Sequence, residues 1–213
     1  MSNVIEGKFM GNKIWGIIMA SDPDIEFVRL CQDGDTSAFD EIVRRHKDRI
    51  YRLVYRMLGN ESEVDDVAQE VFLKAYRHIK KFRFQSCFST WLTQIAVNYC
   101  IGYMKKQRLK MLSLGRRSSD IPQPTTENNE RLDKVRRAIN SLPPKHKAVI
   151  VMHYFENYNC EEMADILKCS SGTVKSRLFY ARSELKKRLK SYLKDEDWTE
   201  DSSQIGGENY EVF

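Results

Sequence analysis

The chain has 213 residues, of which 31% are charged, and it contains only ten glycines and five prolines. This composition is typical of a globular, helical protein of one domain or two small ones, and it excludes a membrane span, which needs a run of about twenty apolar residues. The net charge of +5 is unevenly placed, because residues 131–194 contain fifteen Lys and Arg against six Asp and Glu, whereas residues 195–213 contain seven acids and no base. Such a basic region favours a nucleic-acid partner.

The first 23 residues contain one short apolar run, Ile14 to Ala20, that follows Lys8 and Lys13. A signal peptide has a similar order, but this run is at the lower limit of the length that a signal peptide needs. We therefore expect residues 1–23 to form an N-terminal extension, with Met19 as an alternative start.

Residues 24–106 show continuous helical periodicity, which predicts a first domain. Three apolar stripes with spacings of three and four residues indicate three amphipathic helices, the first of which stops at Gly59. Residues 80–87 continue neither neighbouring stripe, so we expect an exposed loop there. The stripes are Phe39, Ile42, Val43, Ile50, Leu53, Val54 and Met57; Val64, Val67, Ala68, Val71, Phe72, Ala75, Tyr76 and Ile79; and Phe88, Trp91, Leu92, Ile95, Ala96, Tyr99 and Tyr103.

Residues 107–130 become basic and then polar, with Pro122 and Pro124, and this composition predicts a flexible linker. Helical periodicity returns over a second domain, residues 131–194, with an interruption at Pro143-Pro144. Residues 195–213 form an acidic tail, which either solubilises the chain or competes with DNA for the basic domain. No strand pattern is present, so the expected fold is all-α, with two small helical domains joined by a flexible linker.

Residues 159–189 predict two short helices joined by a tight turn, an arrangement that fits a DNA major groove. Asn159 and Glu162 match the capping box that starts a helix, and Ser170 is a second N-cap. One face of the second helix combines Lys and Arg side chains with hydroxyls and aromatic rings. Such a face suits contacts with DNA phosphates and with the edges of the nucleobases. The alternative is a surface helix whose basic side faces only solvent. The polar face comprises Lys175, Ser176, Arg177, Phe179, Tyr180, Arg182 and Lys186.

No group of residues has the spacing that catalysis or metal binding requires. Adjacent acids such as Asp65 and Asp66 diverge by about 100° on a helix, so they cannot act on one substrate atom. No histidine pair has metal-ligand spacing, and we expect His46, on an apolar stripe, to be hydrogen-bonded and partly buried. We therefore expect no enzymatic activity, no metal and no cofactor. The histidines are His46, His78, His146 and His153.

Five cysteines form an odd set without a C-x-x-C pair, which excludes a secreted disulfide framework and a zinc ribbon. We expect reduced, mostly buried thiols in a cytoplasmic protein. The cysteines are Cys31, Cys87, Cys100, Cys160 and Cys169.

The predicted helix over residues 64–79 also has a polar face. Asp65 and Asp66 lie near its start, where acids stabilise a helix through its dipole. Gln69 and Glu70 continue the same face and offer a docking surface for a protein partner. The residues alone leave both interpretations open.

Two sets of motifs carry a family resemblance. The first domain contains Gly34-Asp35, Ala38-Phe39, Tyr51-Arg52-Leu53, Asp66 to Phe72, Phe88 to Leu92 and Ile95 to Asn98. The second contains Leu142-Pro143-Pro144, Tyr154-Phe155-Glu156, Glu161 to Leu167 and Gly172 to Leu178. These motifs are similar to regions 2 and 4 of the extracytoplasmic-function sigma factors, in the same order and over residues 24–189. A linker in place of a middle domain marks this group within the sigma factors.

The resemblance implies a factor that binds core RNA polymerase, recognises promoter DNA and promotes its melting, with an anti-sigma factor as a further partner. It implies no membrane insertion and no small-molecule substrate. Core polymerase binding is implied for Asp65, Asp66, Gln69, Glu70 and Phe72. Capture of an unstacked base of the minus-10 element is implied for Arg83, Phe84, Gln85, Phe88, Ser89 and Asn98. Reading of the minus-35 element is implied for Thr173, Lys175, Ser176, Arg177, Phe179 and Arg182.

Four positions depart from the family pattern. Phe84 replaces a usual glycine and Ser89 a common arginine, so the family's minus-10 preference does not transfer. Lys168 replaces a frequent glycine in the tight turn. Gly102 lies inside a predicted helix, where it costs about 1 kcal/mol relative to Ala.

Two other classes of protein are alternatives. A stand-alone regulator would use the same helix-turn-helix on duplex DNA, but it has no need of the acid and amide face at residues 66–70. An enzyme acting on nucleic acid would need metal ligands or a catalytic base, which the sequence lacks. For a sigma factor, we expect Arg177 to contact base edges, and Lys187 and Arg188 to contact phosphates.

Overall fold

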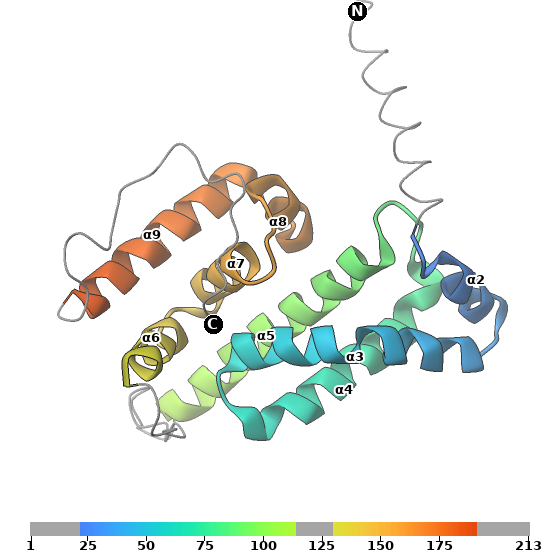
Figure 1. Ribbon diagram of the computed structural model, residues 1–213, viewed down its shortest axis with the longest axis horizontal. Coiled ribbons are helices and arrows are strands. Elements are labelled where there is room, and N and C mark those ends of the chain that lie inside the picture. The colour runs from blue at the N-terminus through green and yellow to red at the C-terminus, as the bar shows by residue number, and fades with distance from the viewer. Residues whose placement is uncertain (1–21, 114–129, 191–213) are drawn as a thin grey trace, which may run out of the picture.

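The computed structural model describes residues 22–113 and 130–190, and within these ranges the regular elements are all helices, as predicted (Figure 1). The rest of the chain, which includes residues 1–21 of the N-terminal extension, residues 114–129 of the linker and the acidic tail, lies outside the described residues. The elements are α2 (Ile25–Asp33), α3 (Ser37–Leu58), the 3-10 turn η1 (Glu61–Glu63), α4 (Val64–His78), the 3-10 turn η2 (Ile79–Lys81), α5 (Phe88–Ser113), α6 (Glu130–Asn140), α7 (Pro144–Tyr154), α8 (Cys160–Leu167) and α9 (Ser171–Leu189).

The first unit consists of α2, α3, α4 and α5. Helix α3 packs against the other three, and α4 also packs against α5. The predicted stripes of α3 and α4 face the shared core, where Ile42, Leu53 and Val71 are fully buried. Helix α3 ends where predicted, because Gly59 adopts a left-handed φ of 74° and its N–H donates to the carbonyl of Tyr55.

Two predictions about the chain around α5 are wrong. Helix α5 continues to Ser113, so residues 107–113 belong to a helix and not to the linker. This stretch is rich in good helix formers and contains neither Gly nor Pro, so nothing in it ends the helix. Before α5, Lys80 and Lys81 lie in η2 and Phe82 is buried, so the exposed loop is shorter than expected.

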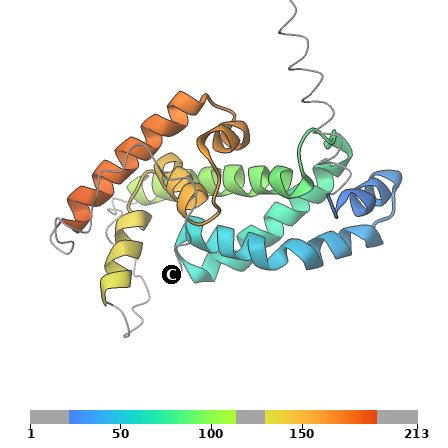
Figure 2. The same ribbon diagram turned by 45° about the horizontal axis from the view of Figure 1, so that its top comes forward.

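The second unit consists of α6, α7, α8 and α9. Residues 147–152 of α7 are all buried, although successive side chains point about 100° apart around a helix. Such a helix needs neighbours on every side. In Figures 1 and 2, α7 lies between α9 and α5, and it also contacts α8 and α3. The two predicted domains therefore pack together, which the sequence does not predict.

Two glycines provide a matched test, since Gly102 lies inside a helix and Gly59 at a helix end. Gly102 lies inside α5 with no atom within 4 Å of a Cβ added there, so Gly102→Ala should raise the free energy of unfolding by about 1 kcal/mol. Gly59→Ala should lower it by about 1 kcal/mol or more, because an alanine Cβ is disfavoured at φ 74° and would overlap the Asn140 side chain. Urea unfolding of both variants checks the opposite signs. Equal shifts would contradict this account of the Gly59 helix end.

Lys147 provides a pH test of the packing. Its side chain is 1% exposed, and burial lowers its pKa to about 7. The unfolded chain therefore binds more protons than the folded chain above pH 7, so stability should rise with pH by up to about 1.4 kcal/mol per unit. Lys147→Met should lack this rise in urea unfolding between pH 7 and 8.5. Higher pH is avoided because burial raises the pKa of Cys100 to about 12, which has the opposite effect on stability. Parallel curves for the two proteins would contradict a neutral buried lysine.

Candidate nucleic-acid interfaces and docking groove

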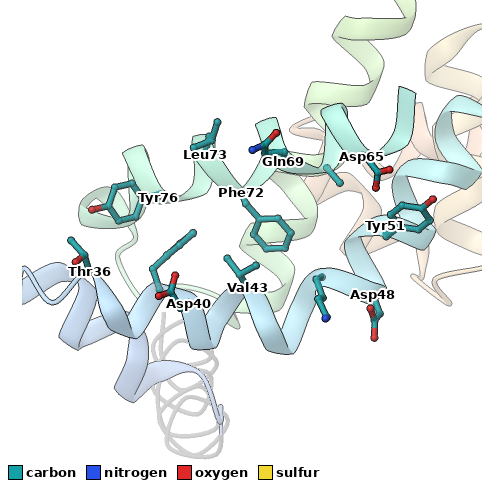
Figure 3. A pocket seen from close by; sticks show the side chains of 13 residues that line it. Thr36, Asp40, Val43, Asp48, Tyr51, Asp65, Gln69, Phe72, Leu73 and Tyr76 are labelled. Carbon is teal, nitrogen blue, oxygen red and sulfur yellow. The ribbon is translucent and has the colours of Figure 1, made fainter. Parts of the chain in front are cut away.

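A groove with a volume of about 620 Å³ lies between α3 and α4, and we call it the docking groove (Figure 3). The ring of Phe72 points from α4 towards Val43 of α3, between the two helices. Acids from both helices, including Asp40, Asp48 and Asp65, lie along the groove. It therefore combines an apolar interior with an acidic border. Its lining residues are Thr36, Phe39, Asp40, Val43, Lys47, Asp48, Tyr51, Asp65, Ala68, Gln69, Phe72, Leu73 and Tyr76.

The five residues of α4 expected to bind a partner do not share one surface. Asp65, Gln69 and Phe72 line the docking groove, with Phe72 only 9% exposed. Asp66 and Glu70 lie on the α5 side of the helix. Burial raises the pKa of the phenols of Tyr99 and Tyr103, and the nearby charges of Glu70 and Asp66, respectively, raise it further. One turn of helix brings residues 65, 69 and 72 to one side and residues 66 and 70 to another.

Two residues of the docking groove, Leu73 and Tyr76, were not expected from the sequence to contact a partner. Leu73 is 38% exposed, and Tyr76, assigned to the buried stripe, is 41% exposed. The Tyr76 ring packs edge-on against Phe39 with centroids 5.0 Å apart, at the end of the groove. Periodicity places both residues near the apolar side of α4, but only the position of α3 determines that they stay accessible.

The segment before α5 is supported by aromatic packing. Phe82 is buried, and its ring centroid lies 5.7 Å from that of Phe88 and 5.3 Å from that of Trp91. The Gln32 side chain donates to the carbonyls of Ile79 and Phe82, and the Asp22 carboxylate accepts from the backbone N–H of Phe88 at 2.8 Å. The base of the loop is therefore fixed by α2 and by the start of α5.

The capture loop, which we define as residues 83–88, presents polar groups from this support. Arg83 and Gln85 are exposed, and Ser89 is half-buried. Asn98 is also exposed, but it lies ten residues after Phe88 along α5. Phe84 has a left-handed φ of 55°, a backbone conformation that favours glycine, and its ring centroid lies 5.7 Å from the Arg29 guanidinium.

Phe88 differs from the other residues expected at this site. It is fully buried and belongs to the aromatic support, so a base cannot stack on its ring in this structure. Phenylalanine beside a polar loop is equally compatible with stacking or with packing, and only the positions of Phe82 and Trp91 decide between them.

The predicted helix-turn-helix is confirmed in its local details. The Asn159 side chain accepts from the backbone N–H groups of Glu161 and Glu162, and the Glu162 carboxylate accepts from the Asn159 N–H at 2.8 Å, which completes the capping box. Lys168 ends α8 with a left-handed φ of 50°, and Ser170 caps α9 through the N–H of Thr173. The two helices thus have fixed ends at the turn.

The exposed side of α9 is narrower than the predicted polar face. Five of its seven residues are exposed, namely Lys175, Ser176, Phe179, Tyr180 and, further along the helix, Lys186. We call the first four the reading face. Phe179 is 69% exposed and Tyr180 is 64% exposed, and their rings are in edge-to-face contact with centroids 5.7 Å apart. Large exposed aromatic side chains beside a lysine are typical of a binding surface.

Arg177 and Arg182 do not belong to the reading face. An Arg177 N–H lies 3.6 Å from the Cys169 sulfur, and the Arg182 guanidinium lies 5.6 Å from the centre of the Tyr154 ring. Both arginines are half-buried, and the Thr173 hydroxyl pairs with that of Ser170. In this structure these three side chains therefore contact the turn and α7, and their contact with DNA stays a prediction.

No set of three His, Cys, Asp or Glu side chains in residues 22–113 and 130–190 could bind a metal ion. His46 is 8% exposed and hydrogen-bonds Asp24 at 2.7 Å, which confirms the expected satisfied ring. Cys31 and Cys100 are buried and the other cysteines half-buried. No helix in the described part of the chain is long and apolar enough to cross a membrane.

Comparison with known families matches both units. The family described as Sigma-70 region 2 matches residues 42–110, and the family described as Sigma-70, region 4 matches residues 132–185. The first match contains helix α4 of the docking groove and the capture loop, and the second contains α8 and most of α9.

Curated relatives match along most of their length. The ECF RNA polymerase sigma factor SigW of Bacillus subtilis is 35% identical over 177 residues, which cover 76% of this chain and 95% of that protein. The ECF RNA polymerase sigma-E factor of Escherichia coli K12 is 34% identical over 192 residues, which cover 80% of this chain and 96% of that protein.

Solved structures share the fold at lower identity. CnrH in complex with the cytosolic domain of CnrY gives a TM-score of 0.58 at 24% identity over 81% of this chain and all of that chain. The sigma factor RpoE in complex with the anti-sigma factor NepR, from Bartonella quintana, gives 0.56 at 21% identity over 73% of this chain and 98% of that chain. With both units, their order and their motifs matched, the chain belongs to the extracytoplasmic-function group of the sigma-70 family of RNA polymerase sigma factors.

Proposed function

We propose that this protein is a transcription initiation factor that acts in the cytoplasm and binds core RNA polymerase through the docking groove, the minus-10 element through the capture loop and the minus-35 element through α9. The observation that carries the proposal is the docking groove. A stand-alone DNA-binding regulator needs the reading face, but it has no use for an accessible groove on the other unit.

The docking groove suits a helical segment of the polymerase. An amphipathic helix binds a groove by inserting apolar side chains, and Phe72, Leu73 and Tyr76 offer apolar contacts for them. Asp40, Asp48 and Asp65 along the groove favour basic residues beside the inserted side chains. Phe72 then serves as the interior of the groove, while Gln69 provides a hydrogen-bonding group at its edge.

The capture loop suits one unstacked base of melted DNA. A flipped base offers a π-face and a free Watson–Crick edge, which arginine and amide side chains can contact. Arg83, Gln85 and Asn98 are exposed and provide such groups. Because the loop is fixed by Asp22 and Gln32, these side chains start from a defined position.

The reading face suits the major groove of duplex DNA. Lys175 and Ser176 lie in the first two turns of α9, the part of a recognition helix that meets base edges. Phe179 and Tyr180 add apolar contacts to thymine methyl groups or sugars. Lys187 and Arg188 lie further along the helix and suit phosphates.

An anti-sigma factor is the second protein partner of this proposal. RpoE of Bartonella quintana is solved with the anti-sigma factor NepR, and it has the same fold. Such a partner would cover the docking groove or another surface by which this protein contacts core polymerase. We therefore expect it to act by competing with core polymerase.

Run-off transcription tests the proposal. Purified core polymerase is incubated with a set of genomic promoter fragments, with and without this protein, and the proposal predicts specific transcripts only in its presence. Specific duplex binding by the protein alone, without holoenzyme formation or transcripts, would instead support the stand-alone regulator.

A further inference from the structure

Both ends of the capture loop are held by side chains from the segment that contains α2. Gln32 of α2 donates to the carbonyl of Ile79 at 2.8 Å and to the carbonyl of Phe82 at 3.0 Å, so it fixes the turn that leads into the loop. Asp22, just before α2, accepts from the backbone N–H of Phe88 at 2.8 Å, where the loop enters α5. The two ends are therefore tied to the same short segment.

The middle of the loop has a third contact with α2. Phe84 is half-buried, and its left-handed φ of 55° is a conformation that side chains with a Cβ disfavour. Its ring packs edge-on against Phe82 with centroids 5.0 Å apart, and the Arg29 guanidinium lies 5.7 Å from its centroid, within the range of a cation–π contact. These two contacts offset the cost of the backbone conformation. We call Asp22, Arg29 and Gln32 the brace.

Helix α2 gives the brace a fixed base. It lies beside the start of α5 in Figures 1 and 2, and it packs against α3 and η2. Val28 of α2 is fully buried, and Cys31 is 6% exposed. Arg29 and Gln32 are three positions apart, so the helix presents both of them on one side. The brace precedes residue 42, where the match to Sigma-70 region 2 begins.

The loop depends on this outside support. Among the described residues, the backbone of residues 83–86 forms no hydrogen bond with another backbone group. The relative positions of Arg83 and Gln85 therefore depend on the side chains that hold the loop. A loop that is ordered before it binds loses less conformational entropy on binding than a free loop, and it binds more tightly for that reason.

We propose that α2 is a functional part of the minus-10 site, in which Gln32 and Arg29 are positioning residues that keep the capture loop in the shape that binds an unstacked base. This inference rests on the proposed function for the identity of the ligand. Neither residue has to contact DNA, because Gln32 acts through the backbone at Phe82 and Arg29 acts through the ring of Phe84. Capture of the base then depends on residues that precede the matched region.

Nuclear magnetic resonance relaxation on the free, full-length protein tests the positioning without polymerase. Backbone order parameters of residues 83–87 should be about 0.85 in the wild type, the value of a rigid backbone, and should fall towards about 0.6 in Gln32→Met. Methionine keeps the length of the side chain and removes both donors. Gln107→Met is the matched control, because Gln107 also donates two hydrogen bonds, to Glu63 and Tyr103, but lies further along α5. Unchanged order parameters in Gln32→Met would overturn the proposal.

Binding of single-stranded DNA by the holoenzyme tests the function. The probes are oligonucleotides from both strands of the minus-10 element of a promoter that gives a run-off transcript. Gln32→Met should bind the preferred strand about tenfold more weakly than the wild type. Its affinities for core polymerase and for a duplex carrying only the minus-35 element should stay unchanged, which a general loss of folding would not allow. Unchanged binding of the preferred strand, or an equal loss for the minus-35 duplex, would overturn the proposal.

A double-mutant cycle separates positioning from direct contact with DNA. Phe84→Gly tolerates the left-handed backbone but removes the ring that Arg29 contacts. Arg29→Ala should weaken binding of the preferred strand about threefold in the wild-type background and not at all in the Phe84→Gly background. Arg44→Ala is the control, because Arg44 is also exposed and pairs with Glu41. A loss that persists without the Phe84 ring would overturn the positioning role of Arg29.

The two kinds of measurement fail separately. If the wild type forms no holoenzyme, the proposed function fails, while the order parameters of the free protein still decide whether the brace holds the capture loop.

Discussion

Leu73→Lys should lower the affinity of this protein for core RNA polymerase by more than tenfold, with a parallel loss of run-off transcription. Leu73 is an exposed apolar side chain of the docking groove, beside Gln69 and Phe72. We expect Leu73 to be a hot spot at the centre of the interface, and loss of such a side chain costs about 2 kcal/mol or more. An added cation would also repel basic residues of a partner that the acidic border attracts.

Leu30→Lys is the control for this experiment. Leu30 is 41% exposed against 38% for Leu73, and it lies on α2, outside the docking groove. The two substitutions therefore change surface charge and hydrophobicity equally. Co-purification with core polymerase, together with circular dichroism, compares them. If both variants bind as the wild type does, the docking groove is not the polymerase site.

Lys175→Ala should change the sequence preference of the holoenzyme at one or two positions of the minus-35 element. Lys175 is exposed near the start of α9, next to Ser176, whereas Arg177 faces Cys169 and is half-buried. We therefore assign base contact to Lys175 and a supporting role to Arg177, in place of the base contact expected for Arg177. Loss of a base-edge contact should cost about 1–3 kcal/mol on the preferred promoters.

Lys187→Ala is the matched variant for this test. Lys187 is also an exposed lysine of α9, three turns further along, where a recognition helix meets the DNA backbone. It should weaken all promoters about equally and reduce the salt slope of binding by about one unit. Promoter-library transcription at two salt concentrations separates the two outcomes. A uniform loss for Lys175→Ala would place this lysine among the phosphate contacts.

The sequence predicts helix positions well where their causes are local. The capping box of Asn159 and Glu162, the N-cap of Ser170 and the stop at Gly59 each depend on residues within about four positions, so they can be read directly. The predicted start of the linker is an exception. A basic composition suggests a linker at residues 107–113, but composition does not end a helix when Gly and Pro are absent.

The accessible groups of the site are only partly predictable. The sequence identifies α4 and α9 as polar-faced helices, yet it assigns Asp65 and Asp66 to one surface and Arg177 to the reading face. Which side chain stays free depends on the neighbouring helix: α3 leaves Leu73 and Tyr76 accessible, and the aromatic support covers Phe88. Periodicity reports the apolar side of a helix but not the position of its neighbours.

By itself, the sequence determined the helical class, the helix ends and the family, because periodicity, caps and motifs are properties of short segments. The tertiary structure alone decided that the two units pack together. Arg56 of α3 donates to the carboxylate of Glu156, which lies 100 positions later in the chain, and in the sequence both charges look like ordinary solvated groups. A contact between two surfaces depends on the shape of both, and no single segment contains that information.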